Sequence, residues 1–231
     1  EAKRGLYAGI EPALGPDALL TTNTSSIPLD ELRTGLARPA QFAGLHYFNP
    51  VALMPLVEIV RHDAMDPETE RRLAAFCKAI DKLPVPVAGT PGFLVNRLFM
   101  AYLNEAAFCL EERAASATEM DAAVVEWGMP MGPFTLMDML GIDVCKYTGD
   151  YMADEYGPRM AAGNLFTKMV AAGRLGEKAG KGFYGYGDAG WTDSAVRRYV
   201  TDAGSLLERL HRLTRSDVTT RNRRKAERLA F

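Results

Sequence analysis

A proline-containing turn between two apolar runs is the feature that most constrains the fold of this chain. The run "FAGLHYF" at 42–48 is aromatic, "LVEIV" at 56–60 is β-branched, and the segment between them includes two prolines. Strand-forming runs on both sides of a turn predict two neighbouring strands that pair like a hairpin. If the pair is centred near Ala52, His46 and Glu58 lie opposite each other.

A histidine facing a glutamate has a chemical meaning. A carboxylate beside one imidazole nitrogen fixes the tautomer of the ring and leaves the other nitrogen free to move a proton. In many acid–base sites a carboxylate of this kind is hydrogen-bonded to the histidine that acts as the base. The same spacing also fits a strand histidine with a chance carboxylate neighbour, so the residues alone leave both interpretations of His46 and Glu58 open.

The remainder of residues 1–90 alternates helical and strand-like patterns, which is typical of an α/β layer. Ser26 or Asp30 could cap the short helix expected around "LDELRT". The other expected elements are helices over 2–14 and 66–83, a short apolar strand that runs into a polar loop within 19–26, and a strand over 84–89.

Residues 92–175 show apolar spacing typical of helices throughout. A capping-box-like pair, Thr118 and Asp121, predicts the start of one helix, and Gly128 predicts its end. The segment "TPGF" at 90–93 is the expected hinge between the two halves. We therefore expect three parts: an α/β part over 1–90, a helical part over 91–190, and an amphipathic helix with a basic tail over 191–231.

Composition narrows the classes of function. A net charge of −2 gives no sign of nucleic-acid binding, and no apolar run of about 18 residues predicts a membrane span. Three widely spaced cysteines, Cys77, Cys109 and Cys145, fit buried free thiols in a reducing compartment better than disulfides or a metal site. We expect a cytoplasmic protein.

Two polar patterns are candidates for ligand contacts. "TTNTSS" at 21–26 follows a strand, where loops of open α/β sheets bind ligands, although an ordinary capping turn also fits. Asn96 lies early in an apolar helix, where its amide either donates to a ligand carbonyl or is satisfied inside the protein.

The stretch "GKGFYG" at 180–185 matches the G-x-G-x-x-G pattern of dinucleotide-binding turns. That turn needs a hydrophobic strand before it and a helix after it, and neither pattern is present here. We interpret this stretch as an ordinary loop.

Five stretches taken together resemble the 3-hydroxyacyl-CoA dehydrogenase family, in order over residues 15–187. The segments "IPLDEL" at 27–32 and "MPLVEIV" at 54–60 look closer to the multifunctional fatty-acid-oxidation enzymes. The stretches are "NTSS", "FAGLHYFNPVALMPLVEIV", "TPGFLVNRL", "GMPMGPFTLMDMLGID" and "GEKAGKGFYGY". The resemblance implies an α/β plus all-α fold, with a partial Rossmann-type domain followed by a helical domain.

The resemblance also implies a reaction, the oxidation of a 3-hydroxyacyl-CoA to a 3-ketoacyl-CoA with NAD in fatty-acid β-oxidation. His46 matches the family's general base, and Glu58 matches its electrostatic partner. Ser25 matches the serine that bonds the substrate oxygen, and Asn96 matches the asparagine that holds and polarises the substrate.

The implied cofactor is NAD, and its contacts follow the same resemblance. Asn23, Ser25 and Asn49 match positions near the nicotinamide end, and Lys178 matches a lysine that reaches the cofactor from the C-terminal segment. The implied partners are an acyl-CoA substrate and either further copies of the chain or a larger multifunctional chain.

The chain departs from the family at both ends. The strand, glycine-rich turn and helix with which the family begins are absent, so we expect a portion of a larger enzyme that lacks half of its NAD-binding domain. The alternative is a non-catalytic assembly or dimerisation module derived from that family. Beyond "GFYGY", apolar residues at helical spacing from Val196 to Leu213 predict an extra amphipathic helix, followed by a basic tail.

Overall fold

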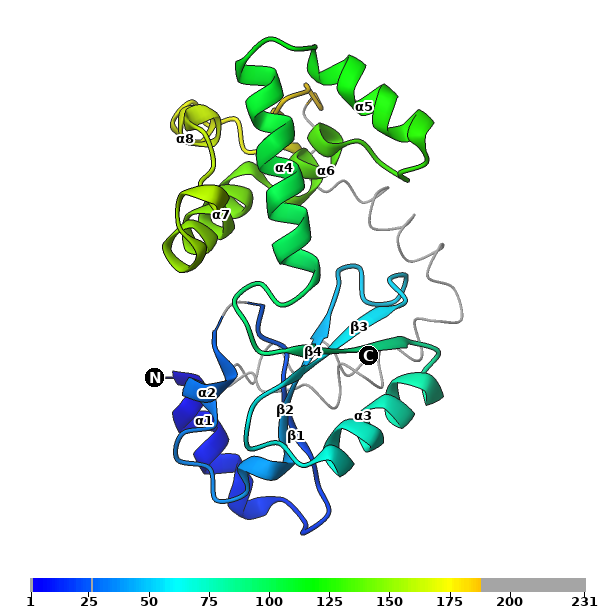
Figure 1. The fold of residues 1–231 in the computed structure, drawn as a ribbon, viewed down its shortest axis with the longest axis vertical. Coiled ribbons are helices and arrows are strands. Elements are labelled where there is room, and N and C mark those ends of the chain that lie inside the picture. The colour runs from blue at the N-terminus through cyan, green and yellow to red at the C-terminus, as the bar shows by residue number, and fades with distance from the viewer. Residues whose placement is uncertain (1, 26, 188–231) are drawn as a thin grey trace.

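The computed structural model describes residues 2–25 and 27–187. An α/β part holds a small sheet, and a helical part lies beyond one end of it (Figure 1). The chain passes from one part to the other through residues 89–94, which we name the crossing segment. The expected class, a partial Rossmann-type domain followed by a helical domain, is confirmed.

The sheet has four strands, in the order β1 (Leu20–Thr22), β2 (Phe42–Tyr47), β3 (Leu56–Arg61) and β4 (Leu83–Ala88). β1 runs parallel to β2 and β3 runs parallel to β4, while β2 and β3 are antiparallel. The register of this central pair places His46 opposite Glu58, as the sequence predicts.

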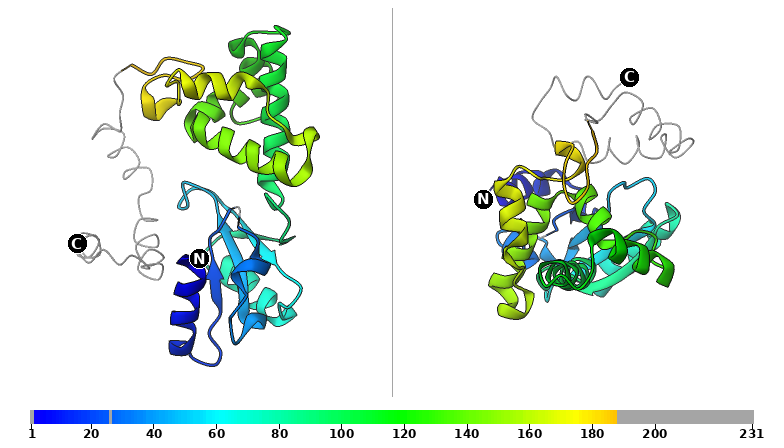
Figure 2. Two further views of the ribbon diagram at one scale, coloured as in Figure 1. Left: turned by 90° about the vertical axis from the view of Figure 1, so that its left-hand side faces the viewer. Right: turned by 90° about the horizontal axis from the view of Figure 1, so that it is seen from above.

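Both faces of the sheet are covered, which explains why its strands are apolar almost throughout. Figures 1 and 2 show α1 (Ala2–Ile10) and α3 (Pro67–Ala79) on opposite sides of the strands. Phe42 and Val60 pack toward α1 in one buried cluster, and Leu45 and Ile59 pack toward α3 in another. His46 and Glu58 share the face of Phe42 and Val60, because alternate residues of a strand point the same way.

The helices expected over 66–83 and around "LDELRT" are present as α3 and α2 (Leu29–Leu32), but the cap expected from Asp30 is wrong. Asp66 caps α3, with its carboxylate accepting from the backbone N–H of Glu68, and Pro67 follows at the first helical position. In α2 the N-cap residue is Pro28, with no side-chain cap. Asp30 lies inside α2 and forms an ion pair with Arg33 instead, and Ser26 lies outside the described residues.

The helical part consists of five α-helices within the described residues. Its core includes Leu103, Phe134, Met137, Ile142 and Phe166. The helices are α4 (Val95–Glu111), α5 (Ala117–Trp127), α6 (Pro133–Leu140), α7 (Ile142–Tyr156) and α8 (Asn164–Ala171), with 3-10 turns η3 (Pro158–Met160) and η4 (Glu177–Ala179) after α7 and α8; two earlier 3-10 turns, η1 (Glu11–Ala13) and η2 (Pro39–Gln41), belong to the α/β part.

The capping box of α5 differs from the predicted one. Ser116 caps the helix, and Glu119 completes the box by bonding back to the backbone of Ser116. Thr118 therefore lies within the first turn rather than before it. The Asp121 carboxylate instead accepts from two backbone N–H groups at the start of the next helix, α6. Gly128 ends α5 in the left-handed conformation, as expected.

The "GKGFYG" stretch folds as a tight turn against α6, in agreement with its interpretation as a loop. The buried Asp138 carboxylate accepts from the backbone N–H groups of Phe183 and Tyr184, and from the hydroxyl of Tyr186. The turn therefore packs against a carboxylate, and a strand-to-helix junction is not formed there.

The cysteines are free thiols, as predicted: Cys77 and Cys145 are buried and Cys109 is half-buried. Within residues 2–25 and 27–187, every helix is too short or too polar to cross a membrane. The amphipathic helix and basic tail predicted over 191–231 lie outside the described residues.

Candidate active site

A buried histidine–glutamate pair lies at the centre of the sheet. Nδ1 of His46 is 2.7 Å from Oε2 of Glu58, with the histidine 7% and the glutamate 0% exposed. An ionised carboxylate only accepts hydrogen bonds, so Nδ1 carries the proton and donates it. Nε2 then keeps its lone pair, and no hydrogen-bond partner for it occurs among the described residues.

The second carboxylate oxygen of Glu58 reaches the helical part. Oε1 accepts from the backbone N–H groups of Leu94, at 3.0 Å, and Val95, at 2.9 Å. These groups open α4, whose own N-cap residue offers no side-chain bond. The start of a helix carries a partial positive charge, so it favours an ionised carboxylate there. Glu58 therefore caps α4 from the sheet while it orients His46.

Two aromatic rings fix the plane of the imidazole. Phe48 meets the ring of His46 edge-on, with the ring centres 4.8 Å apart, and Phe93 does the same at 5.6 Å. Phe93 is buried and has a positive φ of 48°, which is uncommon for a non-glycine residue. Neither phenylalanine is among the site residues predicted from the sequence. Both lie in the sequence motifs that contain His46 and Asn96, and this proximity in sequence could have indicated their place in the site.

The predicted polar residues lie in the loops after β1 and β2 and in the first turn of α4. Asn23 follows β1, and its Oδ1 accepts from the backbone N–H of Tyr47, the neighbour of His46, at 3.0 Å. Ser25 and Asn49 are exposed in the loops after the parallel strands β1 and β2. Asn96 is half-buried in the first turn of α4, next to the backbone that Glu58 holds.

Lys178 has its contacts in the helical part. It lies in η4 and forms an ion pair with Asp143 in the first turn of α7. The hydrogen bond from the lysine holds the pKa of Asp143 below its usual value. In this arrangement the described contacts of Lys178 do not include His46 or Glu58.

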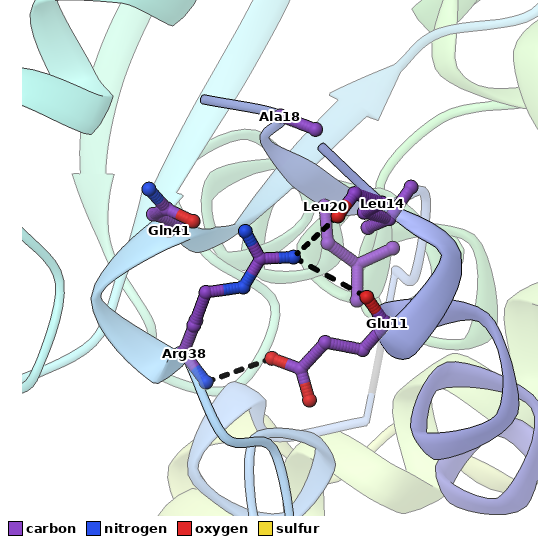
Figure 3. Close-up of a pocket in the computed structure, with 6 residues that line it drawn as sticks. All are labelled: Glu11, Leu14, Ala18, Leu20, Arg38 and Gln41. Carbon is purple, nitrogen blue, oxygen red and sulfur yellow. Dashed lines mark hydrogen bonds between the residues drawn. The ribbon is translucent and has the colours of Figure 1, made fainter. Parts of the chain in front are cut away.

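A small pocket in the α/β part is structural. Figure 3 shows its lining: Glu11, Leu14, Ala18, Leu20, Arg38 and Gln41. The buried carboxylate of Glu11 accepts from the backbone N–H groups of Ala37 and Arg38, both at 2.7 Å. None of the residues predicted for catalysis or cofactor binding lines this pocket.

Comparison with known protein families matches both parts of the chain. Residues 1–90 match the 3-hydroxyacyl-CoA dehydrogenase NAD-binding domain, and residues 92–186 match the C-terminal domain of the same enzymes. An (S)-3-hydroxybutyryl-CoA dehydrogenase from Ralstonia eutropha has a similar structure, with a TM-score of 0.77 and 35% identity, over 81% of this chain and 67% of that one.

The chain belongs to the 3-hydroxyacyl-CoA dehydrogenase family.

Other members of the 3-hydroxyacyl-CoA dehydrogenase family are longer than the matching region. A probable 3-hydroxyacyl-CoA dehydrogenase of Caenorhabditis elegans is 44% identical, over 80% of this chain and 63% of its own length. The fatty acid oxidation complex subunit alpha of Shewanella amazonensis is 41% identical, over 81% of this chain and 26% of its own length.

The residues of this NAD-binding domain fit one end of the cofactor. Exposed Asn23, Ser25 and Asn49 lie at the carboxyl ends of parallel strands, where open α/β sheets bind nucleotides, and their polar groups suit a carboxamide and a ribose. Between the strands and helices of the described residues there is no glycine-rich turn of the kind that holds a pyrophosphate. The described residues also hold no cluster of metal ligands.

Proposed function

We propose that this chain carries the proton-transfer centre of an NAD-dependent oxidation of 3-hydroxyacyl-CoA to 3-ketoacyl-CoA in fatty-acid β-oxidation. The observation that carries the proposal is the buried pair in which Nδ1 of His46 lies 2.7 Å from Glu58. A neutral imidazole held in one tautomer, with its other nitrogen unoccupied, is the arrangement that a general base requires.

Each residue of the site then has a role in the reaction. Nε2 of His46 takes the proton of the 3-hydroxyl group, and Glu58 stabilises the imidazolium that forms. Ser25 and Asn96 donate hydrogen bonds to the substrate oxygen as it gains carbonyl character. NAD, when bound, accepts the hydride that leaves C3 of the substrate.

The cofactor contacts extend the same proposal. Asn23, Ser25 and Asn49 would hold the nicotinamide end of NAD, and Lys178 in η4 would supply a positive charge to it. The Ralstonia eutropha structure is of a hydroxybutyryl-CoA dehydrogenase, and the Shewanella relative is a subunit of a fatty acid oxidation complex. The first supports an acyl-CoA substrate, and the second supports work within a larger complex.

The test is binding and turnover in a version of the chain extended to the length of its longer relatives. Calorimetry measures the affinity for NADH and acetoacetyl-CoA, and loss of NADH absorbance measures reduction of the 3-keto group. We expect His46→Gln to lower the rate by about 10²- to 10⁴-fold, the usual contribution of a general base, with binding of acetoacetyl-CoA nearly unchanged. Equal rates for the variant and the parent chain would rule out this role for His46.

A non-catalytic assembly module is the second candidate. Apolar side chains of α5 favour it, because Val125 is 48% exposed and Trp127 is 83% exposed. This candidate predicts self-association in sedimentation experiments, with no binding of NADH and no turnover. The catalytic proposal predicts both binding and turnover, whatever the oligomeric state.

A further inference from the structure

The crossing segment is held from both parts of the molecule. On the side of the sheet, Glu58 bonds the backbone N–H groups of Leu94 and Val95. On the side of the helical part, the hydroxyl of Tyr156, the last residue of α7, donates to the backbone carbonyl of Pro91 at 2.9 Å. The same few residues of backbone therefore connect the carboxylate beside His46 to the end of α7.

Further contacts fasten α7 to this backbone. Met152 is fully buried against Gly92, so closely that a Cβ at Gly92 would lie 2.7 Å from its sulfur. The guanidinium of Arg97 lies 4.3 Å from the centre of the Tyr156 ring, a cation–π contact from the first turn of α4. Gly92 and Arg97 therefore both pack against the last turns of α7.

The carboxylate of Glu58 transmits the position of this backbone to the imidazole. It is 0% exposed, so water does not reach it. An N–H group that moves away therefore leaves a buried carboxylate oxygen without its hydrogen bond. One oxygen is bonded to two N–H groups of the backbone and the other to Nδ1 of His46. If Leu94 and Val95 move, the carboxylate either follows them and turns away from the ring, or loses their bonds.

We propose that Tyr156 is a positioning residue for the His46–Glu58 pair, acting through the crossing segment. This inference rests on the proposed function of the pair as base and orienting carboxylate. The chain of contacts is short. The Tyr156 hydroxyl donates to the carbonyl of Pro91, which lies in a turn closed by a 2.9 Å hydrogen bond from the N–H of Phe93 to the carbonyl of Thr90. Glu58 then accepts from the N–H groups of Leu94 and Val95, directly after this turn. Tyr156 therefore sets where the sheet-bound carboxylate finds its donors.

The experiment uses Tyr156→Phe, which removes the hydroxyl and keeps the ring stacked on Arg97. Tyr147→Phe is the matched control, because it makes the same chemical change on the same helix at a side chain that is 68% exposed. The chain is labelled with ¹⁵N-histidine, and the His46 signals are assigned by their loss in His46→Gln. The readouts are the Nδ1–H proton of His46, amide exchange at Leu94 and Val95, and the melting temperature.

In Tyr156→Phe we expect the His46 Nδ1–H signal to shift or broaden, and exchange at Leu94 and Val95 to accelerate roughly tenfold, the factor that corresponds to one hydrogen bond. Tyr147→Phe should change neither. A merely structural Tyr156 would lower the melting temperature and leave the His46 signal where the control has it, and that result would overturn the proposal.

Two features keep the test decisive. Met152→Ala loosens the second contact between α7 and the crossing segment, and it should displace the same His46 signal if Tyr156→Phe does not fold. All readouts are made without NADH or acyl-CoA. Failure of the extended version to turn over therefore argues against the proposed function, whereas an unmoved His46 signal argues against the positioning role of Tyr156.

Discussion

Glu58 lies directly opposite His46 across the β2–β3 pair and binds the imidazole with one oxygen and the start of α4 with the other. A single buried carboxylate therefore orients the ring and caps the first helix of the helical part. Any change to Glu58 acts on both, and the two effects can be measured separately.

Glu58→Gln should abolish the base while leaving the fold intact. A glutamine oxygen can still accept from Leu94 and Val95, so its NH₂ group then faces Nδ1 of His46. Nδ1 must accept that bond, which moves the ring proton to Nε2 and removes the lone pair needed for proton transfer. We expect a rate loss of about 10²- to 10⁴-fold in acetoacetyl-CoA reduction.

The tautomer of His46 in Glu58→Gln is read from its ¹⁵N shifts. Glu119→Gln, at the exposed capping box of α5, is the matched control and should keep the parent tautomer and rate. If Glu58→Gln keeps the proton on Nδ1 and still loses its rate, the orienting role assigned to the carboxylate is wrong.

Lys178→Gln should weaken NADH binding without unfolding the chain. An exposed ion pair contributes only about 0–1 kcal/mol, so loss of the bond to Asp143 should barely change the melting temperature. Asp143→Asn breaks the same pair and keeps the lysine. Calorimetry should therefore show weaker NADH binding for the lysine variant alone, and equal affinities for both variants would remove Lys178 from the cofactor site.

Much of the architecture follows from local rules in the sequence. The turn between two strand-forming runs predicts the antiparallel pair and the register that places His46 opposite Glu58. The helix expected over 66–83 begins at Pro67, as α3. Gly128, the glycine expected to end a helix, ends α5. In each case the physical cause lies within a few residues of the feature.

The features that could not be predicted depend on contacts between distant segments. Asp121 lies in α5 and was expected to help cap that helix. Its carboxylate instead accepts from N–H groups at the start of α6, because the packing of the two helices brings that start close to it. Tyr156 and Pro91 are 65 positions apart, so no periodicity relates them. The roles of Ser25, Asn49 and Asn96 stay predictions, since their assigned partners are ligands.

Gly176 should tolerate no side chain. Its φ is +93°, and an added Cβ would lie 2.1 Å from the backbone carbonyl oxygen of Asp138, so the backbone of the turn would have to shift. Left-handed strain and overpacking each contribute about 1–3 kcal/mol, so we expect Gly176→Ala to lose about 2–6 kcal/mol of unfolding free energy.

Gly173→Ala is the matched control for that substitution. Gly173 also has a positive φ, of +66°, but an added Cβ would meet no atom within 4 Å. Left-handed strain alone predicts a loss of roughly 1–2 kcal/mol in urea unfolding. Similar losses for both variants would show that the turn at Gly176 yields to a methyl group more easily than its geometry indicates.

Stability should fall above pH 9 because of two buried thiols. Burial raises the pKa of Cys77 to about 11, and burial together with the nearby carboxylates of Asp143 and Asp138 raises the pKa of Cys145 to about 12. Between pH 9 and these values the unfolded thiols lose protons that the folded thiols keep. The unfolded state then binds fewer protons, so the unfolding free energy decreases as pH rises.

At pH 10 this effect amounts to about 1 kcal/mol for each thiol, or about 2–3 kcal/mol for the pair. Urea unfolding at pH 8 and pH 10 measures it, with Cys77→Ala/Cys145→Ala as the comparison, since every other titrating group is shared. The parent chain should lose more stability over this interval than the variant, whose curve at pH 8 starts lower because of its lost packing. Parallel losses in the two proteins would mean that the thiols titrate alike in the folded and unfolded states, which contradicts their burial in the cores on either side of the crossing segment.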